Sequence, residues 1–182
     1  TPQEILEFSN DLRSIPKHLT DLIKKHDALS RQIAHLFVKT KDVIFLGRGI
    51  NYPIALEGAL KLKEISYIHA QGYPAGELKH GPIALLDQHV PVVSIAAPGV
   101  VYEKVLSNSQ EAKARDARLI GVTTSGPESE MFDELFTIPK VSEWVSPLLT
   151  VVPLQLFSYH IAAHKGLDVD QPRNLAKSVT VE

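Results

Sequence analysis

The chain has 182 residues, with 19 basic and 21 acidic side chains, so its formal charge at pH 7 is −2. This balance argues against nucleic-acid binding, which needs a surplus of positive charge. The absence of cysteine excludes disulfides, thiolate metal sites and a cysteine nucleophile. The longest apolar stretches, about a dozen residues, are too short to span a membrane, and no export leader opens the chain, so we expect a cytoplasmic domain.

Residues 1–40 have a helical pattern. Thr1-Pro2-Gln3-Glu4 combines a capping box with a proline at the first helical position, and apolar residues follow at helical spacing. Pro16 is expected to end this helix. Apolar residues recur from Leu19 and again from near Asp27, which predicts two more helical segments. We expect this helical lead-in to pack on the following domain or to exchange with that of a second copy.

From residue 42 the chain alternates between short apolar runs and helical segments. The runs are residues 43–46, 90–96, 119–123 and 135–138. They lack polar alternation, which predicts strands buried on both faces, as in a parallel sheet. The helical segments are residues 52–66, 101–116 and 147–165. This order predicts a three-layer α/β sandwich with an open, mostly parallel sheet of about five strands, formed by residues 41–182.

The last predicted helix is largely apolar. Ser146 is expected to cap it, Pro153 to kink it and Gly166 to end it. His160 and His164 stand four residues apart, as zinc ligands can, but the metalloprotease motif also needs a glutamate directly after the first histidine. Two polar residues on an apolar helix are the favoured interpretation, and we predict no metal.

Gly47-Arg48-Gly49 follows the first predicted strand, where a phosphate-binding or dinucleotide-binding loop would lie. The dinucleotide fingerprint needs a third glycine, and Tyr52 stands at that position. A tight turn between strand and helix is therefore favoured, and no cofactor is predicted.

Three features allow both a functional and a structural interpretation. Glu57, Lys61 and Glu64 share one face of a predicted helix that is apolar around much of its circumference. They form either a site or a solvated stripe, and the periodicity favours neither. His80 lies in a loop rich in glycine and proline, where it is either an acid/base group or part of a capping turn. Lys177 lies in the polar C-terminal segment, where a lysine is usually just exposed.

Four segments together resemble one family closely. They are LGRG at residues 46–49, ALEGALKLKEIS at 55–66, AGELKHGP at 75–82 and DVDQPRNLAKSVTVE at 168–182. This combination is similar to the C-terminal sugar-isomerase (SIS) half of the glucosamine-6-phosphate synthases, also called glutamine–fructose-6-phosphate aminotransferases (isomerizing). The resemblance runs from about Asp42 to the last residue and implies a SIS fold and an enzyme of amino-sugar synthesis without a cofactor.

The resemblance also implies roles for individual residues. Glu64 matches the carboxylate that moves a proton between C1 and C2 of the open-chain sugar. His80 matches the histidine that assists ring opening in the neighbouring subunit's site. Lys177 matches the lysine that forms a Schiff base with the ketone of fructose 6-phosphate. Lys61 matches a supporting cation beside Glu64, and Ala176 a substrate-binding residue.

Two parts of the family's machinery are missing from this sequence. The strand-end turn at residues 96–101 has no hydroxyl groups with which to hold a phosphate, and residues 123–126 are a weak substitute. The glutaminase half is also absent. Because the first residue is Thr1 and the one methionine is Met131, we expect a fragment or a processed product. The implied partners are the first SIS half, which would share the sugar phosphate, the glutaminase domain and a second copy in a homodimer.

The position of Glu64 supports a shared site. It stands about thirteen residues into the predicted helix, which puts it about 20 Å from the strand ends where α/β sheets usually bind ligands. Glu64 is therefore expected to act on a ligand held by another domain, and the isolated chain to be inactive. Two alternatives remain: a non-catalytic SIS module that binds sugar phosphates, and an isomerase of another ketose phosphate.

Overall fold

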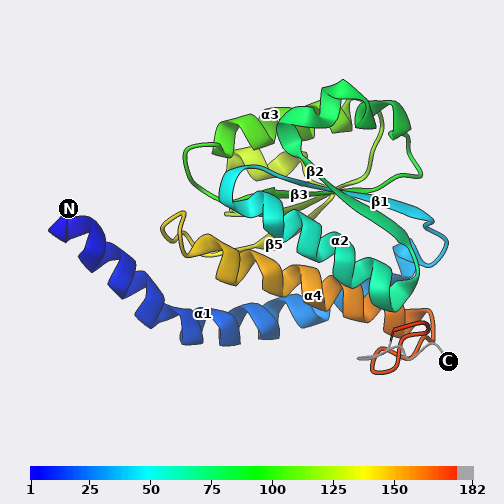
Figure 1. Cartoon of the computed structure of the whole chain (residues 1–182), viewed down its shortest axis with the longest axis horizontal. Coiled ribbons are helices and arrows are strands. Elements are labelled where there is room, and N and C mark those ends of the chain that lie inside the picture. Colours follow the sequence, from blue (N-terminus) through cyan, green and yellow to red (C-terminus); the bar gives the residue numbers. More distant parts are fainter. Residues whose placement is uncertain (176–182) are drawn as a thin grey trace, which may run out of the picture.

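A computed structural model describes residues 1–175 and has a five-stranded parallel sheet at its centre (Figure 1). The sheet order is β2-β1-β3-β4-β5, and every neighbouring pair is parallel. The strands are β1 (Asp42–Gly47), β2 (His69–Pro74), β3 (Val92–Ala96), β4 (Leu119–Thr123) and β5 (Glu134–Thr137). The predicted α/β architecture with five parallel strands is confirmed. The second strand, at the edge of the sheet, was not predicted.

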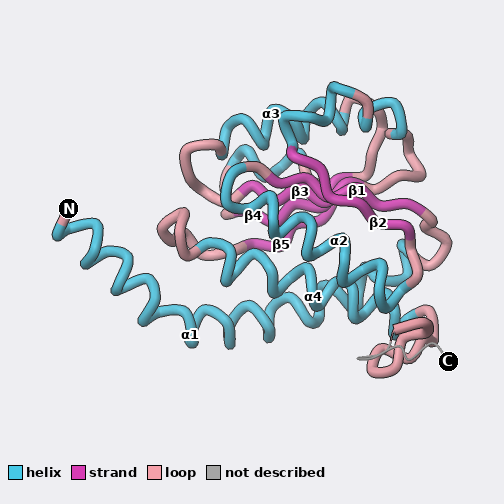
Figure 2. The backbone as a smooth tube through the Cα atoms, in the orientation of Figure 1, coloured by secondary structure: helices cyan, strands magenta, loops and turns pink. Residues whose placement is uncertain are grey.

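Helices cover both faces of the sheet, which gives the three layers (Figure 2). On one face lie α1 (Pro2–Ile33), α2 (Tyr52–Ser66) and α4 (Ser146–His164), packed over a core that includes Phe45 and Phe157. On the other face, α3 (Tyr102–Lys113) and short 3-10 turns cover a smaller core that includes Leu46 and Leu119. The helices predicted at residues 52–66, 101–116 and 147–165 therefore form, with small shifts at the ends of the last two.

The expectation that Pro16 ends the first helix is wrong. The capping box of Thr1 and Glu4 forms as predicted, but α1 continues through Pro16 to Ile33, and a 3-10 turn (Ala34–Phe37) follows. An internal proline costs a helix about 3 kcal/mol. Burial of one stripe of the helix offsets that cost, since helices in proteins owe most of their stability to packing. The buried stripe consists of Ile15, Leu22, His26, Ser30 and Ile33.

The last helix differs from the prediction at its start. Its N-cap is Val145, which makes no side-chain cap, and Ser146 is the first helical residue. The Ser146 hydroxyl instead donates to the Glu143 carbonyl over 2.8 Å. The helix continues through Pro153, and Gly166 follows it with a φ of 70°, a conformation that suits glycine. His160 bonds through Nε2 to Asp27 Oδ1 at 2.8 Å, which joins α4 to α1. Within residues 1–175, no helix is long and apolar enough to cross a lipid bilayer.

Candidate active site

The α2 helix packs tightly through one face, and this determines which face remains accessible. Gly58 lies where a Cβ atom would stand 2.9 Å from Cε1 of Phe45 on β1 and 2.8 Å from Cδ1 of Leu154 on α4. Such distances leave no room for a side chain, so glycine allows the helix to approach its neighbours closely. The side chains of Glu57, Lys61 and Glu64 remain partly accessible to solvent on α2.

Lys61 is the centre of this charged stripe. Its Nζ lies 2.7 Å from Glu64 Oε2 and 3.8 Å from Glu57 Oε1. The hydrogen bond to Glu64 raises the pKa of Lys61, and the charge of Glu57 adds to the effect. The Glu64 side chain keeps 27% of its surface exposed. The stripe is therefore neither buried nor fully solvated. It presents a carboxylate that is held by a cation and remains open to a ligand.

Glu64 lies far from the carboxyl ends of the strands. The register pairs Gly47 with Pro74 at the carboxyl ends of β1 and β2, and Asp42 with His69 at the amino ends. The α2 helix crosses from the first of these ends to the second, because it starts after β1 and leads into β2. Glu64, near its last turn, thus lies toward the amino ends of the strands.

His80 lies at the other end of the sheet. It is the last residue of a 3-10 turn (Ala75–His80) that follows the carboxyl end of β2. Its Nδ1 lies 2.8 Å from Glu77 Oε2, and its side chain is 69% exposed. The fold therefore separates His80 from Glu64 within one chain. If the two serve one reaction, they come from different copies of the chain.

An acidic side chain that the sequence analysis did not identify lies against the turn after β3. The Val100 backbone N–H donates to Glu143 Oε2 over 3.3 Å. A Cβ atom on Gly99 would stand 2.8 Å from that oxygen, and one on Gly49 would stand 3.8 Å from Oε1. The carboxylate of Glu143 thus lies between the turns after β1 and β3. Only the fold brings Glu143 there, since it follows β5 in sequence.

The C-terminal segment returns to the end of α2. The guanidinium carbon of Arg173 lies 4.1 Å from the centre of the Tyr67 ring, and Tyr67 is the C-cap of α2. Ala176 and Lys177, predicted as site residues, lie outside the described residues. Tyr67 was not predicted as a functional residue, because nothing near it in the sequence indicates the contact with Arg173.

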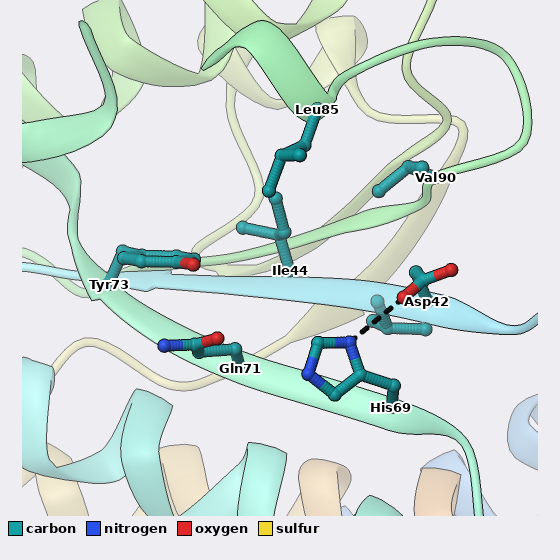
Figure 3. Close-up of a pocket in the computed structure, with 8 residues that line it drawn as sticks. Asp42, Ile44, His69, Gln71, Tyr73, Leu85 and Val90 are labelled. Atoms are coloured by element: carbon teal, nitrogen blue, oxygen red, sulfur yellow. Dashed lines mark hydrogen bonds and ion pairs between the residues drawn. The ribbon is translucent and has the colours of Figure 1, made fainter. Parts of the chain in front are cut away.

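A cavity of about 220 Å³ opens on the sheet face opposite α2, beside the edge strand β2 (Figure 3). His69 Nδ1 and Asp42 Oδ1 pair at one end of it over 2.9 Å. The rest of its lining is uncharged and comes from Val43, Ile44, Gln71, Tyr73, Leu85 and Val90. Neither Glu64 nor His80 lines this cavity, so it is separate from the predicted site residues.

Comparison with known proteins identifies the family. The SIS domain model matches residues 36–165, which include all five strands of the sheet. The chain belongs to the SIS domain family. Over 99% of its length it is 69% identical to the glutamine–fructose-6-phosphate aminotransferase (isomerizing) of Nostoc sp. (strain PCC 9229). It is 50% identical to the enzyme of the same name from Methanosarcina acetivorans, over 100% of its length.

This SIS chain corresponds to part of those proteins, spanning 29% of the Nostoc enzyme and 30% of the Methanosarcina enzyme. Among solved structures it resembles the C-terminal domain of glucosamine-fructose-6-phosphate aminotransferase from Francisella tularensis. The TM-score is 0.86 and the identity 43%, over 94% of this chain and 48% of that one. The tagatose-6-phosphate ketose/aldose isomerase of Escherichia coli shares the fold, with a TM-score of 0.74 and 18% identity over 85% of this chain and 44% of that one. The family predicted from the sequence motifs is confirmed.

Proposed function

We propose that this chain is the C-terminal isomerase half of a glutamine–fructose-6-phosphate aminotransferase and supplies the base for its proton transfer. The observation that carries the proposal is the ion pair between Lys61 Nζ and Glu64 Oε2 at 2.7 Å on an accessible face of α2. A carboxylate held in one orientation reaches two adjacent carbons of a sugar, which a 1,2-proton shift requires. The ammonium group beside it steadies the negative charge that develops on the enediol-like intermediate.

The proposed reaction begins at the ketone of fructose 6-phosphate. The amine of Lys177 adds to C2 and water leaves, which forms an iminium ion. Ammonia released from glutamine then replaces the lysine amine at C2. Glu64 removes a proton from C1 and returns one to C2, which gives the amino aldose phosphate. The balance is fructose 6-phosphate plus ammonia to glucosamine 6-phosphate plus water.

The rest of this reaction needs parts outside the chain. Glu64 lies away from the carboxyl ends of the strands in its own sheet, where such folds usually bind ligands, so the sugar phosphate must be held by another part of the protein. His80 lies at the opposite end of the sheet and would serve ring opening in a second subunit. The relatives are more than three times as long as this chain, which leaves room for both a phosphate-binding half and a glutaminase.

Neither alternative has comparable support. A module that binds sugar phosphates without catalysis needs its own anion site, and Glu143 puts a carboxylate beside the turn where that site would lie. An isomerase of another ketose phosphate shares the fold, but the similar isomerase structure from Escherichia coli is only 18% identical.

The test is isotope exchange in the full-length protein that contains this chain. Glu64→Gln keeps the shape of the side chain and removes the base, so exchange of the C1 proton with solvent should fall by about 10²–10⁴-fold. Sugar phosphate should still bind. Glu103→Gln, the same change at an exposed position on α3, is the control and should leave the exchange rate unchanged. Near-normal formation of glucosamine 6-phosphate by Glu64→Gln would disprove the assignment.

A further inference from the structure

Tyr67 adopts a backbone conformation that tyrosine rarely takes. It is the C-cap of α2, with φ 59° and ψ 19°, and its N–H donates to the Lys63 carbonyl over 3.2 Å. This left-handed region suits glycine or asparagine, and glycine is the residue usually found at such helix ends. A bulky residue stays in a strained conformation when its surroundings hold it there, and such strain clusters at functional sites.

The surroundings of Tyr67 include Arg173, which contacts it twice. The Arg173 guanidinium lies over the ring, 4.1 Å from its centre. The Arg173 backbone N–H donates to the Tyr67 hydroxyl over 2.8 Å. The first contact needs an aromatic face and the second a phenol oxygen, so only tyrosine offers both. One side chain thus holds both the backbone and the side chain of Arg173.

The segment that carries Arg173 is shaped by local turns. Asp168 Oδ1 accepts hydrogen bonds from the N–H groups of Asp170 and Gln171 at 2.9 and 3.0 Å. The Leu175 N–H donates to the Pro172 carbonyl over 3.4 Å. In Figure 1 this segment, drawn in red, lies at the end of the molecule where α2 ends. These turns and the two contacts with Tyr67 direct the chain toward that end of the helix.

We propose that Tyr67 and Arg173 form a clamp that positions the C-terminal segment for catalysis, with Tyr67 and Arg173 as positioning residues. The inference rests on the proposed function, in which Lys177 and Glu64 act on one sugar. Glu64 is three residues before Tyr67 on α2, and Lys177 is four residues after Arg173. Four residues of chain span at most about 14 Å, so anchoring Arg173 at the end of α2 shortens the free tether that carries the lysine.

The expected loss of rate without the clamp follows from the length of the tether that carries Lys177. Without the clamp, the nearest residue in a regular element is His164 at the end of α4, thirteen residues before Lys177 rather than four. The effective concentration of a tethered group falls as about the −3/2 power of tether length, so this lengthening lowers it about sixfold. The phosphate is held elsewhere in the proposed enzyme, so substrate binding should change little.

The experiment uses steady-state kinetics of the full-length enzyme. Tyr67→Gly removes the ring but adopts the required φ without strain, and Arg173→Ala removes the guanidinium. We expect Tyr67→Gly, which removes both contacts, to lower kcat about sixfold, and Arg173→Ala, which keeps the backbone N–H bond to the Tyr67 hydroxyl, to lower it by a smaller factor. Both variants should leave the KM for fructose 6-phosphate within about twofold. The double variant should be no slower than the slower single variant, because the two residues act as one unit. Arg173→Lys, which keeps a cation over the ring, should recover most of the lost rate.

Thermal unfolding distinguishes the clamp from a structural role. Glycine suits this helix end, so Tyr67→Gly should keep or raise the melting temperature while kcat falls. Arg115→Ala, a change of an exposed arginine in the turn just after α3, is the matched control and should leave kcat unchanged. Wild-type kcat in Tyr67→Gly and Arg173→Ala would overturn the clamp. Wild-type activity in Glu64→Gln and Lys177→Ala would overturn the proposed function itself, so the two failures are distinguishable.

Discussion

The Val100 backbone N–H donates to Glu143 Oε2 over 3.3 Å, so the chain provides its own carboxylate at the end of its sheet. Open α/β sheets usually bind ligands beyond the carboxyl ends of their strands, and phosphates use exposed backbone N–H groups there. In this chain an acidic side chain already accepts such a group, and its charge would repel a phosphate. The lack of hydroxyls in residues 96–101 has the same consequence.

We therefore predict that the chain alone binds fructose 6-phosphate no more tightly than about 100 μM and is catalytically inactive. Lys61 could attract the phosphate, but a partly exposed ion pair contributes only about 0–1 kcal/mol, and 100 μM corresponds to about 5.5 kcal/mol. Titration calorimetry with fructose 6-phosphate and glucosamine 6-phosphate measures this directly. Tighter binding by the wild-type chain would mean that this half has a phosphate site of its own. Glu143→Ala, which frees the Val100 N–H, should bind at least as well as the wild type.

The sequence predicted the regular interior of the fold but not its edge. The helix at residues 52–66 has the predicted bounds, because its apolar residues follow helical spacing throughout. The edge strand β2 was missed because its sequence, HAQGYP, has no apolar run. Within residues 1–175, β2 pairs with β1 alone, and Gly72 lies where a Cβ atom would stand only 3.0 Å from the Ala55 backbone. Neither fact is visible in local periodicity.

The residues of the candidate site also fall into those that the sequence could predict and those that it could not. The distance of Glu64 from the strand ends could be calculated from helix rise alone, because it depends only on position within one helix. The roles of Glu143 and Tyr67 could not be predicted, because each depends on a contact between distant parts of the chain, 43 residues apart for Glu143 and Val100 and 106 for Tyr67 and Arg173. The error at Pro16 has a similar origin, since distant packing outweighed a local rule.

A second prediction concerns His26, which makes stability depend on pH. The His26 side chain on α1 is fully buried, with Nε2 bonded to the Thr137 carbonyl over 2.8 Å and Nδ1 without a hydrogen-bond partner among residues 1–175. Burial lowers the pKa of His26; the hydrogen bond to the Thr137 carbonyl raises it and offsets only part of this effect, and the nearby charge of Lys25 lowers it further. The unfolded chain, with a histidine pKa of about 6.5, therefore binds a proton more readily than the folded one. The free energy of unfolding should be constant above about pH 7 and should fall as pH drops below 6.5.

Urea denaturation followed by circular dichroism between pH 5 and 8 tests this, since each pH gives one unfolding free energy. His26→Gln should be less stable than the wild type at pH 8, because it loses a fitted buried ring, and should show a smaller loss between pH 7 and pH 5. The exposed His89 is the control, and His89→Gln should keep the wild-type pH dependence. An identical pH dependence in His26→Gln and the wild type would contradict the assignment.

The last prediction concerns an exposed apolar stripe on the first turns of α1. Ile5, Phe8 and Leu12 are 68%, 38% and 41% exposed, and they continue the stripe that is buried from Ile15 onward. In Figure 1 this part of the helix extends away from the rest of the molecule. Burying an apolar side chain contributes about 1.5–3 kcal/mol, so two such stripes packed together would stabilise a dimer. We predict that the chain self-associates through this face, in line with the homodimer expected from the family resemblance.

Sedimentation equilibrium at tens of micromolar should therefore show a species of twice the 20.1 kDa chain mass. Combining Phe8→Asp with Leu12→Asp puts two charges into the proposed contact and should return the chain to a monomer, since an unpaired charge is costly to bury. These positions are exposed in the single chain, so the substitutions should leave its fold intact, which circular dichroism checks. Asn10→Asp, on the opposite face of the same helix, should remain dimeric. A wild-type chain that sediments only as a monomer would refute this interface, and the exposed stripe would then belong to a contact with the rest of the full-length protein.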